Sequence, residues 1–142
     1  KQFDKKFWGN RYESIQNFEK HLANNGTKIV KIFLNVSKEE QKQRFLDRIN
    51  EDDKNWKFSS ADVTERGFWN DYMKAYESAI NKTSTEYAPW YVIPADQKWF
   101  SRVAAIQIII DKLEEMNLQY PEVSAKEKSA LEDLKIKLES EK

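Results

Sequence analysis

The sequence has 142 residues, with 24 basic side chains balanced by 24 acidic ones, three glycines and no cysteine. That length suits one domain with a real core, and zero net charge gives no global field that would select nucleic acid or a membrane surface. A chain without cysteine has no disulfide framework and no thiolate metal site, and no apolar run approaches the roughly 20 residues of a membrane span, so we expect a soluble, cytoplasmic protein.

The first half of the chain alternates between helical and extended patterns. Residues 10–25 have apolar side chains at helical spacing and end at Gly26. Residues 27–36 form a near-continuous apolar run, which is typical of a strand buried on both faces of a parallel sheet. Ser37 and Glu40 match a capping box and predict a helix to about residue 50, followed by a polar stretch rich in aspartate.

The second half repeats the alternation. Asp62 and Glu65 predict the start of a helix that runs to about Asn81. Residues 90–93 predict a short buried strand, which Pro94 ends. A long helix over residues 97–117 follows. Its predicted inward stripe is Trp99, Val103, Ile106, Ile110 and Leu113.

Pro121 separates that helix from a charged tail. Within the tail, Ser124 and Glu127 match a second capping box and predict a helix. The apolar residues of this helix are Leu131, Leu134 and Leu138.

The resulting order, αβααβα, describes an α/β fold with only two parallel strands. Parallel strands need helices on both faces and usually several neighbouring strands, so two strands cannot bury four helices. The chain also begins at Lys1 without an initiator methionine. We therefore expect the C-terminal half of an α/β domain, with further strands upstream. Such a half would expose a contiguous apolar patch or associate with a second copy of itself.

Basic side chains gather in the segment between the two predicted strands. Arg44 and Arg48 stand four residues apart on one helix face, and Lys57 and Arg66 follow. A helical hairpin with inward arginines is the lid design of nucleoside-monophosphate kinases, where guanidinium groups hold transferring phosphoryl oxygens. The alternative is a solvated face whose charges pair with neighbouring carboxylates. The carboxylates in range are Glu40, Asp47 and Asp52.

Five motifs in order resemble the family-2 polyphosphate kinases, P-loop phosphotransferases similar in fold to thymidylate kinase. The resemblance covers about residues 7–121. The motifs are Phe7-Trp8 with Arg11-Tyr12-Glu13, Phe33-Leu34-Asn35-Val36-Ser37-Lys38-Glu39-Glu40-Gln41, Trp56-Lys57-Phe58-Ser59, Ala88-Pro89-Trp90 and Ile93-Pro94-Ala95-Asp96-Gln97-Lys98-Trp99.

The resemblance implies phosphoryl transfer between inorganic polyphosphate and a nucleotide of the AMP, ADP or GDP class, with Mg²⁺. Residues 1–121 would be the C-terminal part of a P-loop kinase-like domain, with a lid over about 37–81, and residues 122–142 a charged helical tail. Arg44 and Arg48 would clamp phosphoryl groups. The implied substrate contacts are Lys57, Arg66, Pro94, Ala95, Asp96, Lys98 and Arg102. We also expect a homo-oligomer.

The phosphate-cradling loop of that family has no counterpart in the sequence. A Walker A loop needs closely spaced glycines and a lysine, whereas Gly9, Gly26 and Gly67 lie far apart. The Walker B strand and the Mg²⁺ ligands are also expected outside this chain. The resemblance therefore implies that the chain alone is catalytically inactive.

Other interpretations stay open for several residues. Asp96 could cap the following helix instead of contacting a ligand, and Arg102 could pair with an acidic neighbour. The aromatic side chains follow core spacing, except for Trp56 in its polar loop, and His21 lies on a polar helix face. A helical binding or oligomerisation module and a nucleic-acid binder are alternative functions, and zero net charge argues against the second.

Overall fold

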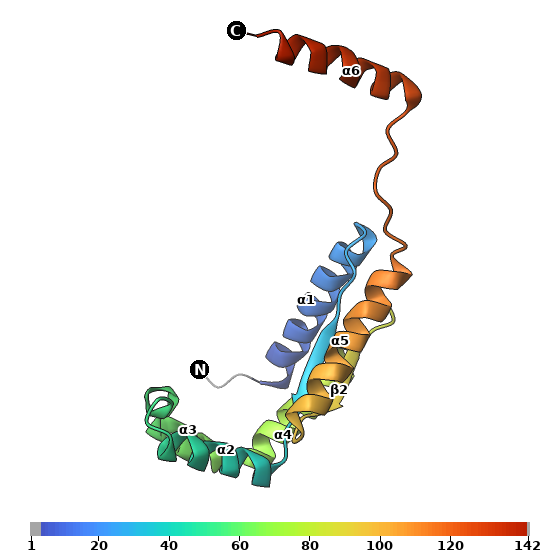
Figure 1. The fold of residues 1–142 in the computed structure, drawn as a ribbon. Coiled ribbons are helices and arrows are strands. Elements are labelled where there is room, and N and C mark those ends of the chain that lie inside the picture. The colour runs from blue at the N-terminus through green and yellow to red at the C-terminus, as the bar shows by residue number, and fades with distance from the viewer. Residues whose placement is uncertain (1–3, 142) are drawn as a thin grey trace. The chain divides into compact units, whose positions relative to one another are not determined.

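The computed structural model describes residues 4–141 (Figure 1). The elements are α1 (Lys5–Asn24), β1 (Lys31–Asn35), α2 (Lys38–Asn50), the 3₁₀ helix η1 (Asn55–Lys57), α3 (Ser60–Arg66), α4 (Trp69–Thr83), β2 (Trp90–Pro94), α5 (Lys98–Glu115) and α6 (Ala125–Glu139). The chain divides into two compact units, Lys1–Lys112 and Leu113–Lys142.

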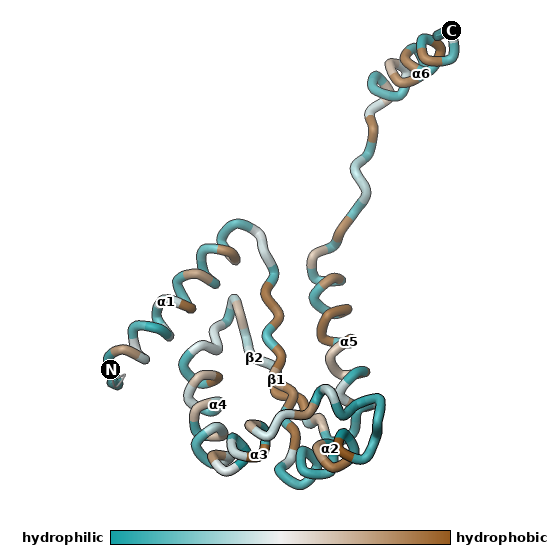
Figure 2. The backbone as a smooth tube through the Cα atoms, turned by 90° about the vertical axis from the view of Figure 1, so that its left-hand side faces the viewer, coloured by the Kyte–Doolittle hydropathy of each residue, from teal (hydrophilic) through white to brown (hydrophobic). Residues whose placement is uncertain are grey.

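The two strands pair in parallel, with Lys31 opposite Trp90 and Asn35 opposite Pro94. This pairing confirms the predicted parallel, adjacent strands. Figure 2 shows α1 and α4 on one side of the strands and α5 on the other, so the first unit has helices on both faces of its sheet. The segment from α2 to α3 lies beyond the carboxyl ends of the strands (Figure 1).

Helix α1 begins five residues before the predicted start. The Asp4 carboxylate accepts a hydrogen bond from the Phe7 backbone N–H at 2.8 Å and caps the helix. The predicted end is confirmed, since Gly26 has φ +87°, a left-handed conformation that glycine adopts without strain.

The predicted single helix from Asp62 to Asn81 is wrong, because the segment forms two helices. Ser59 caps α3, and Asp62 completes its capping box from the third helical position. The chain then makes tight turns at Gly67 and Phe68, whose backbone N–H groups donate to Thr64 and Glu65 carbonyls. These bonds end α3 before α4 begins at Trp69.

The predicted inward stripe of α5 is also wrong, because it faces outward. Trp99 is 66% exposed and Ile106 is 57% exposed, and Val103, Ile110 and Leu113 are exposed as well. The face toward the sheet has small side chains instead, with Ser101 buried.

The large aromatic side chains are only partly buried, contrary to the core positions predicted for them. Tyr72 and Tyr76 are each more than two-fifths exposed, and Trp69 is half-buried. Among residues 4–141, the buried apolar side chains are Ala88, Ile93 and Ala95. The described chain therefore has little closed core and many exposed large apolar side chains.

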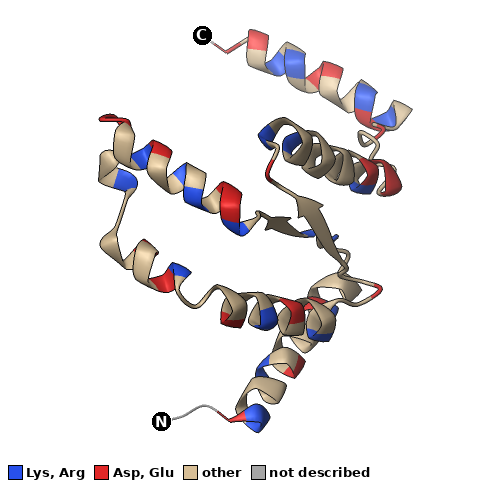
Figure 3. Ribbon diagram, turned by 90° about the horizontal axis from the view of Figure 1, so that it is seen from below, with Lys and Arg blue, Asp and Glu red and all other residues tan. Residues whose placement is uncertain are grey.

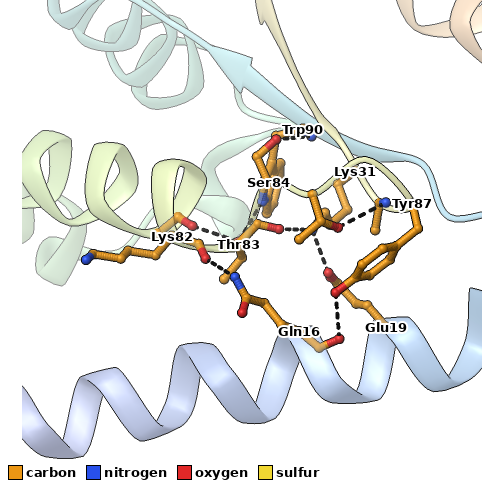
Figure 4. Close-up of polar contacts among 11 residues, drawn as sticks. Gln16, Glu19, Lys31, Lys82, Thr83, Ser84, Tyr87 and Trp90 are labelled. Carbon is orange, nitrogen blue, oxygen red and sulfur yellow. Dashed lines mark hydrogen bonds and ion pairs between the residues drawn. The ribbon is translucent and has the colours of Figure 1, made fainter.

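One buried ion pair connects four elements at the amino ends of the strands (Figure 4). Lys31 Nζ in β1 lies 2.7 Å from Glu19 Oε2 in α1, and both side chains are 11% exposed. The same ammonium donates to the Thr83 carbonyl oxygen at 2.6 Å and lies 5.4 Å from the centre of the Trp90 ring. Trp90 in turn donates from Nε1 to Thr83 Oγ1 at 2.8 Å.

In the second unit, the structure confirms the predicted tail helix. Ser124 and Glu127 form the expected capping box at the start of α6. Its three leucines are all exposed. They are Leu131, Leu134 and Leu138.

Charge is spread over the helices with both signs interspersed (Figure 3). Among the described residues, none of the helices combines the length and apolar character needed to cross a bilayer.

We predict that Lys31→Met lowers the free energy of unfolding by about 3 kcal/mol, because it leaves the Glu19 carboxylate buried without a counter-charge. The double variant Lys31→Met/Glu19→Leu should recover part of that loss. Urea denaturation followed by circular dichroism measures both, with the exposed Lys20→Met on α1 as control. Equal stability of Lys31→Met and the control would show that the pair does not hold the helix to the strands.

Candidate functional site

A cavity of about 420 Å³ opens where the carboxyl end of β1 meets α2, α3 and α4. Three of the four basic residues predicted between the strands line it, namely Arg44, Arg48 and Arg66. The opposite wall is aromatic and includes Trp69, Tyr72 and Tyr76. Carboxyl ends of parallel strands are the usual place for ligands in α/β folds.

Arg44 links α2 to the loop after β2. Its Nε donates to Glu40 Oε1 at 2.8 Å, within the same helix. Its Nη2 donates to the carbonyl oxygens of Ala95 at 2.7 Å and Asp96 at 3.2 Å. The pairing with Glu40 foreseen as an alternative is present, yet the guanidinium is half-buried and bridges two elements.

Asp96 reinforces that link from the other side. Its Oδ1 accepts a hydrogen bond from the Ser37 backbone N–H at 2.7 Å, which ties the loop after β2 to the loop after β1. The hydrogen bonds from Ser37, with the nearby positive charge of Arg44, hold the pKa of the Asp96 carboxyl below its usual value. Asp96 does not cap α5, since that helix begins at Lys98 and the carboxylate is engaged with Ser37.

Arg48 and Arg66 contact aromatic rings. The Arg48 guanidinium carbon lies 5.8 Å from the centre of the Phe45 ring, and that of Arg66 lies 5.9 Å from the Trp69 ring. Arg66 Nη1 also donates to Gln41 Oε1 at 2.8 Å. Within residues 4–141, neither guanidinium forms an ion pair with a carboxylate, so both retain donors for an anion.

Two carboxylates on the cavity wall have partners of their own. Asp62 Oδ2 accepts from the Ser59 backbone N–H at 3.3 Å in the capping box of α3. Glu65 accepts a short hydrogen bond from the Tyr72 hydroxyl, and this bond raises the pKa of the Tyr72 phenol above its ordinary value. The bond joins α3 to α4 along one wall of the cavity.

Six predicted site residues are not part of the cavity lining. Two of them, Ala95 and Asp96, contact Arg44 through their carbonyl oxygens, and the other four are Lys57, Pro94, Lys98 and Arg102. Lys57 is in η1, with its Nζ 4.9 Å from the centre of the Trp56 ring, and Trp56 is 78% exposed, as expected for its polar loop. Pro94, Lys98 and Arg102 are exposed at the end of β2 and on the first turns of α5. The described residues include no acidic partner for Arg102.

Sequence reasoning missed Gln41, Glu65 and Tyr72 as site residues. A signal for Gln41 was present, because residues 41, 44 and 48 fall on one helix face by their spacing. The other two had no such signal, since their contact depends on the break between α3 and α4.

The described part of the chain contains no group of three or more histidine, aspartate or glutamate side chains close enough together to hold a metal ion. The cavity is lined by three arginines and by no such acidic group among the described residues.

Guanidinium groups at the carboxyl ends of parallel strands have the geometry to bind phosphate oxygens. The chain belongs to the polyphosphate kinase 2 family, whose sequence model matches residues 2–121. The match confirms the predicted family and the predicted α/β, P-loop kinase-like fold class.

Relatives of different lengths match the chain. It is 53% identical over 134 residues to an uncharacterized protein of Leptolyngbya boryana and covers 98% of that protein. It is 52% identical over 122 residues to the ADP-polyphosphate phosphotransferase of Rhodopseudomonas palustris, covering 86% of this chain and 42% of the relative.

The crystal structure of polyphosphate kinase 2 from Arthrobacter aurescens TC1 superposes with a TM-score of 0.84 at 43% identity. The match covers 92% of this chain and 47% of that one. The chain therefore spans less than half the length of this kinase and of the Rhodopseudomonas phosphotransferase.

We predict that Asp96→Asn lowers the free energy of unfolding at neutral pH, because an amide accepts the Ser37 N–H bond less strongly than a carboxylate. The folded-state pKa of Asp96 lies below the ordinary value of about 3.9. The stabilisation is thus fully present above that ordinary value and is lost as the pH falls through the folded pKa.

Urea denaturation of wild type and variant between pH 7 and pH 2.5 checks this, with Asp52→Asn as control. The difference between wild type and Asp96→Asn should narrow as the pH falls below about 4. If the difference in the free energy of unfolding between wild type and Asp96→Asn does not change with pH, the Asp96 carboxylate is not the source of that difference.

Proposed function

We propose that this chain contributes the lid and the last strand–helix unit to a phosphotransferase that moves a phosphoryl group between inorganic polyphosphate and a nucleoside mono- or diphosphate. The observation that carries the proposal is the convergence of Arg44, Arg48 and Arg66 on one cavity at the carboxyl end of β1. Family membership supports this proposal over a helical binding module.

In this proposal the three arginines have two different roles, phosphate binding and positioning. Arg48 and Arg66 bind phosphoryl oxygens, since neither pairs with a carboxylate among the described residues. Charge spreads over those oxygens in the transition state, so positioned guanidinium groups stabilise it. Arg44 holds α2 against residues 95 and 96 and keeps the other two aimed at the cavity.

The proposal also assigns a role to the other predicted segments and residues. Residues 37–81 form the proposed lid within a domain part that spans residues 1–121, and residues 122–142 form the tail. The loop Pro94–Asp96 lies on the proposed nucleotide side, with Lys98 and Arg102 beside it and Lys57 on the outer part of the lid. The proposed compartment is the cytoplasm, and the homo-oligomer stays a prediction.

A divalent metal ion, Mg²⁺ in the proposal, would neutralise phosphate charge in the complete enzyme. The residues described here provide no acidic cluster to hold it. We therefore place its ligands outside residues 4–141 and derive no step through it.

We predict that Arg48→Ala lowers kcat on the order of 10²-fold in a chimera in which this chain replaces the matched segment of the Rhodopseudomonas palustris phosphotransferase. Its stability should hardly change, because the side chain makes one ring contact. Arg44→Ala should lower both kcat and stability, because it breaks three hydrogen bonds.

Steady-state assays with polyphosphate and ADP, together with thermal melts, separate the two effects. Lys42→Ala, exposed on the same helix, is the control. If Arg48→Ala keeps the turnover of the control, the cavity is not the phosphoryl site.

We also predict that the 142-residue chain alone produces no new nucleotide from polyphosphate, ADP or AMP and Mg²⁺. Its sequence has no glycine-rich loop to cradle phosphates, and positioning is most of the catalysis of phosphoryl transfer. Chromatography of the reaction mixture measures this, and turnover by the purified chain would place the active site within these residues.

A further inference from the structure

Arg66 is held at the cavity wall by a neutral partner. Its Nη1 donates to the amide oxygen Oε1 of Gln41 at 2.8 Å, and this bond joins α3 to α2. Both side chains are half-buried, and both line the cavity. A carboxylate in place of the Gln41 amide would accept a stronger, charge-assisted bond from the same guanidinium, but it would also neutralise it. The amide orients Arg66 and leaves its positive charge uncompensated.

The two carboxylates of α3 that lie closest in sequence to Arg66 are engaged elsewhere. Asp62 precedes Arg66 by four residues, the spacing at which an acidic and a basic side chain normally pair on a helix. Its carboxylate instead accepts a hydrogen bond from the Ser59 backbone N–H at 3.3 Å. Glu65 accepts its hydrogen bond from the Tyr72 hydroxyl in α4. Neither carboxylate therefore forms an ion pair with Arg66.

Arg44, on the same face of α2 as Gln41, shows the opposite arrangement. Its Nε donates to the Glu40 carboxylate at 2.8 Å, and its Nη2 donates to two backbone carbonyls after β2. That guanidinium is compensated by a charge and serves as a link between elements. The described contacts of Arg66 are with the Gln41 amide and the Trp69 ring, and both groups are uncharged. The same wall of the cavity thus holds one neutralised and one uncompensated guanidinium.

We propose that Gln41 is a positioning residue of the phosphotransfer site, whose neutral amide aims Arg66 at phosphoryl oxygens without compensating its charge. The inference rests on the proposed function, because it requires Arg66 to bind phosphate. It deepens that function by assigning a role to a residue that acts through Arg66. A bridge that merely joined α2 to α3 would respond differently to a carboxylate in place of the amide, because the carboxylate would strengthen it.

The test variant is Gln41→Glu in the chimera with the Rhodopseudomonas palustris phosphotransferase, assayed with polyphosphate and ADP. The substitution keeps the size of the side chain and its bond to Arg66 but adds a negative charge. We expect kcat to fall on the order of tenfold, while the melting temperature stays at or above that of the unsubstituted chimera. The matched control is Gln43→Glu, which should keep its kcat, because Gln43 is exposed on the same helix and lies outside the cavity lining.

A double-mutant cycle tests whether the added carboxylate acts through Arg66. Arg66→Ala alone should lower kcat on the order of 10²-fold. Adding Gln41→Glu to Arg66→Ala should lower kcat by no more than about twofold further, because the guanidinium that the carboxylate neutralises is gone. A further loss as large as that of Gln41→Glu alone would show that the carboxylate repels the substrate directly, and it would overturn the role assigned to Gln41.

A second measurement covers the case in which the chimera is inactive. Isothermal titration calorimetry of the 142-residue chain with inorganic tripolyphosphate at low salt measures phosphate binding without turnover. Gln41→Glu and Arg66→Ala should each weaken the affinity on the order of tenfold, and Gln43→Glu should leave it unchanged. Equal affinity of Gln41→Glu and Gln43→Glu would overturn the inference.

The outcomes separate this inference from the proposed function. If Gln41→Glu keeps the kcat of Gln43→Glu while Arg66→Ala loses activity, the role of Gln41 is wrong and phosphate binding by Arg66 stands. If Arg66→Ala also keeps the kcat of the control, the proposed phosphate contact fails and the inference fails with it. An inactive chimera together with a wild-type chain that does not bind tripolyphosphate would contradict both.

Discussion

The buried ammonium of Lys31 is the contact on which the rest of the first unit depends. It lies at the start of β1 and reaches a carboxylate in α1, a carbonyl at the end of α4 and the Trp90 ring in β2. A charge this deeply buried is tolerated only when its partners are in place. The contact therefore fixes both helices on one face of the strands, and it does so at their amino ends, away from the cavity.

The carboxyl ends of the strands are joined by polar bonds of a different kind. Arg44 and Asp96 cross-link the loops after β1 and β2 through backbone groups, so the position of α2 follows from the pairing of the strands. Arg48 and Arg66 then approach the cavity along aromatic rings instead of carboxylates. Contacts with rings orient a guanidinium without neutralising it, which suits a site for a polyanion.

Apolar surface is distributed in an unusual way for a chain of this length. Small or medium side chains fill the buried positions, while large ones such as Trp99 and Ile106 lie on the outside of α5. The same helix thus has a narrow inner face of small residues for the strands and a broad outer face of large residues. The physical expectation for such a helix is a partner on each side.

The sequence by itself determined the α/β class, the two parallel strands, the family and the arginine set, because periodicity, capping residues and linear motifs are local properties. It could not determine the break at Gly67, the outward direction of Trp99 or the bond between Glu65 and Tyr72. Helical spacing identifies an apolar face but not which face of the helix is buried, and in α5 the buried residue is the small Ser101 while the large apolar side chains are exposed. Only the tertiary structure decided which arginines converge, since Arg48 of α2 and Arg66 of α3 line the same cavity, whereas Lys57 of η1 lies outside it.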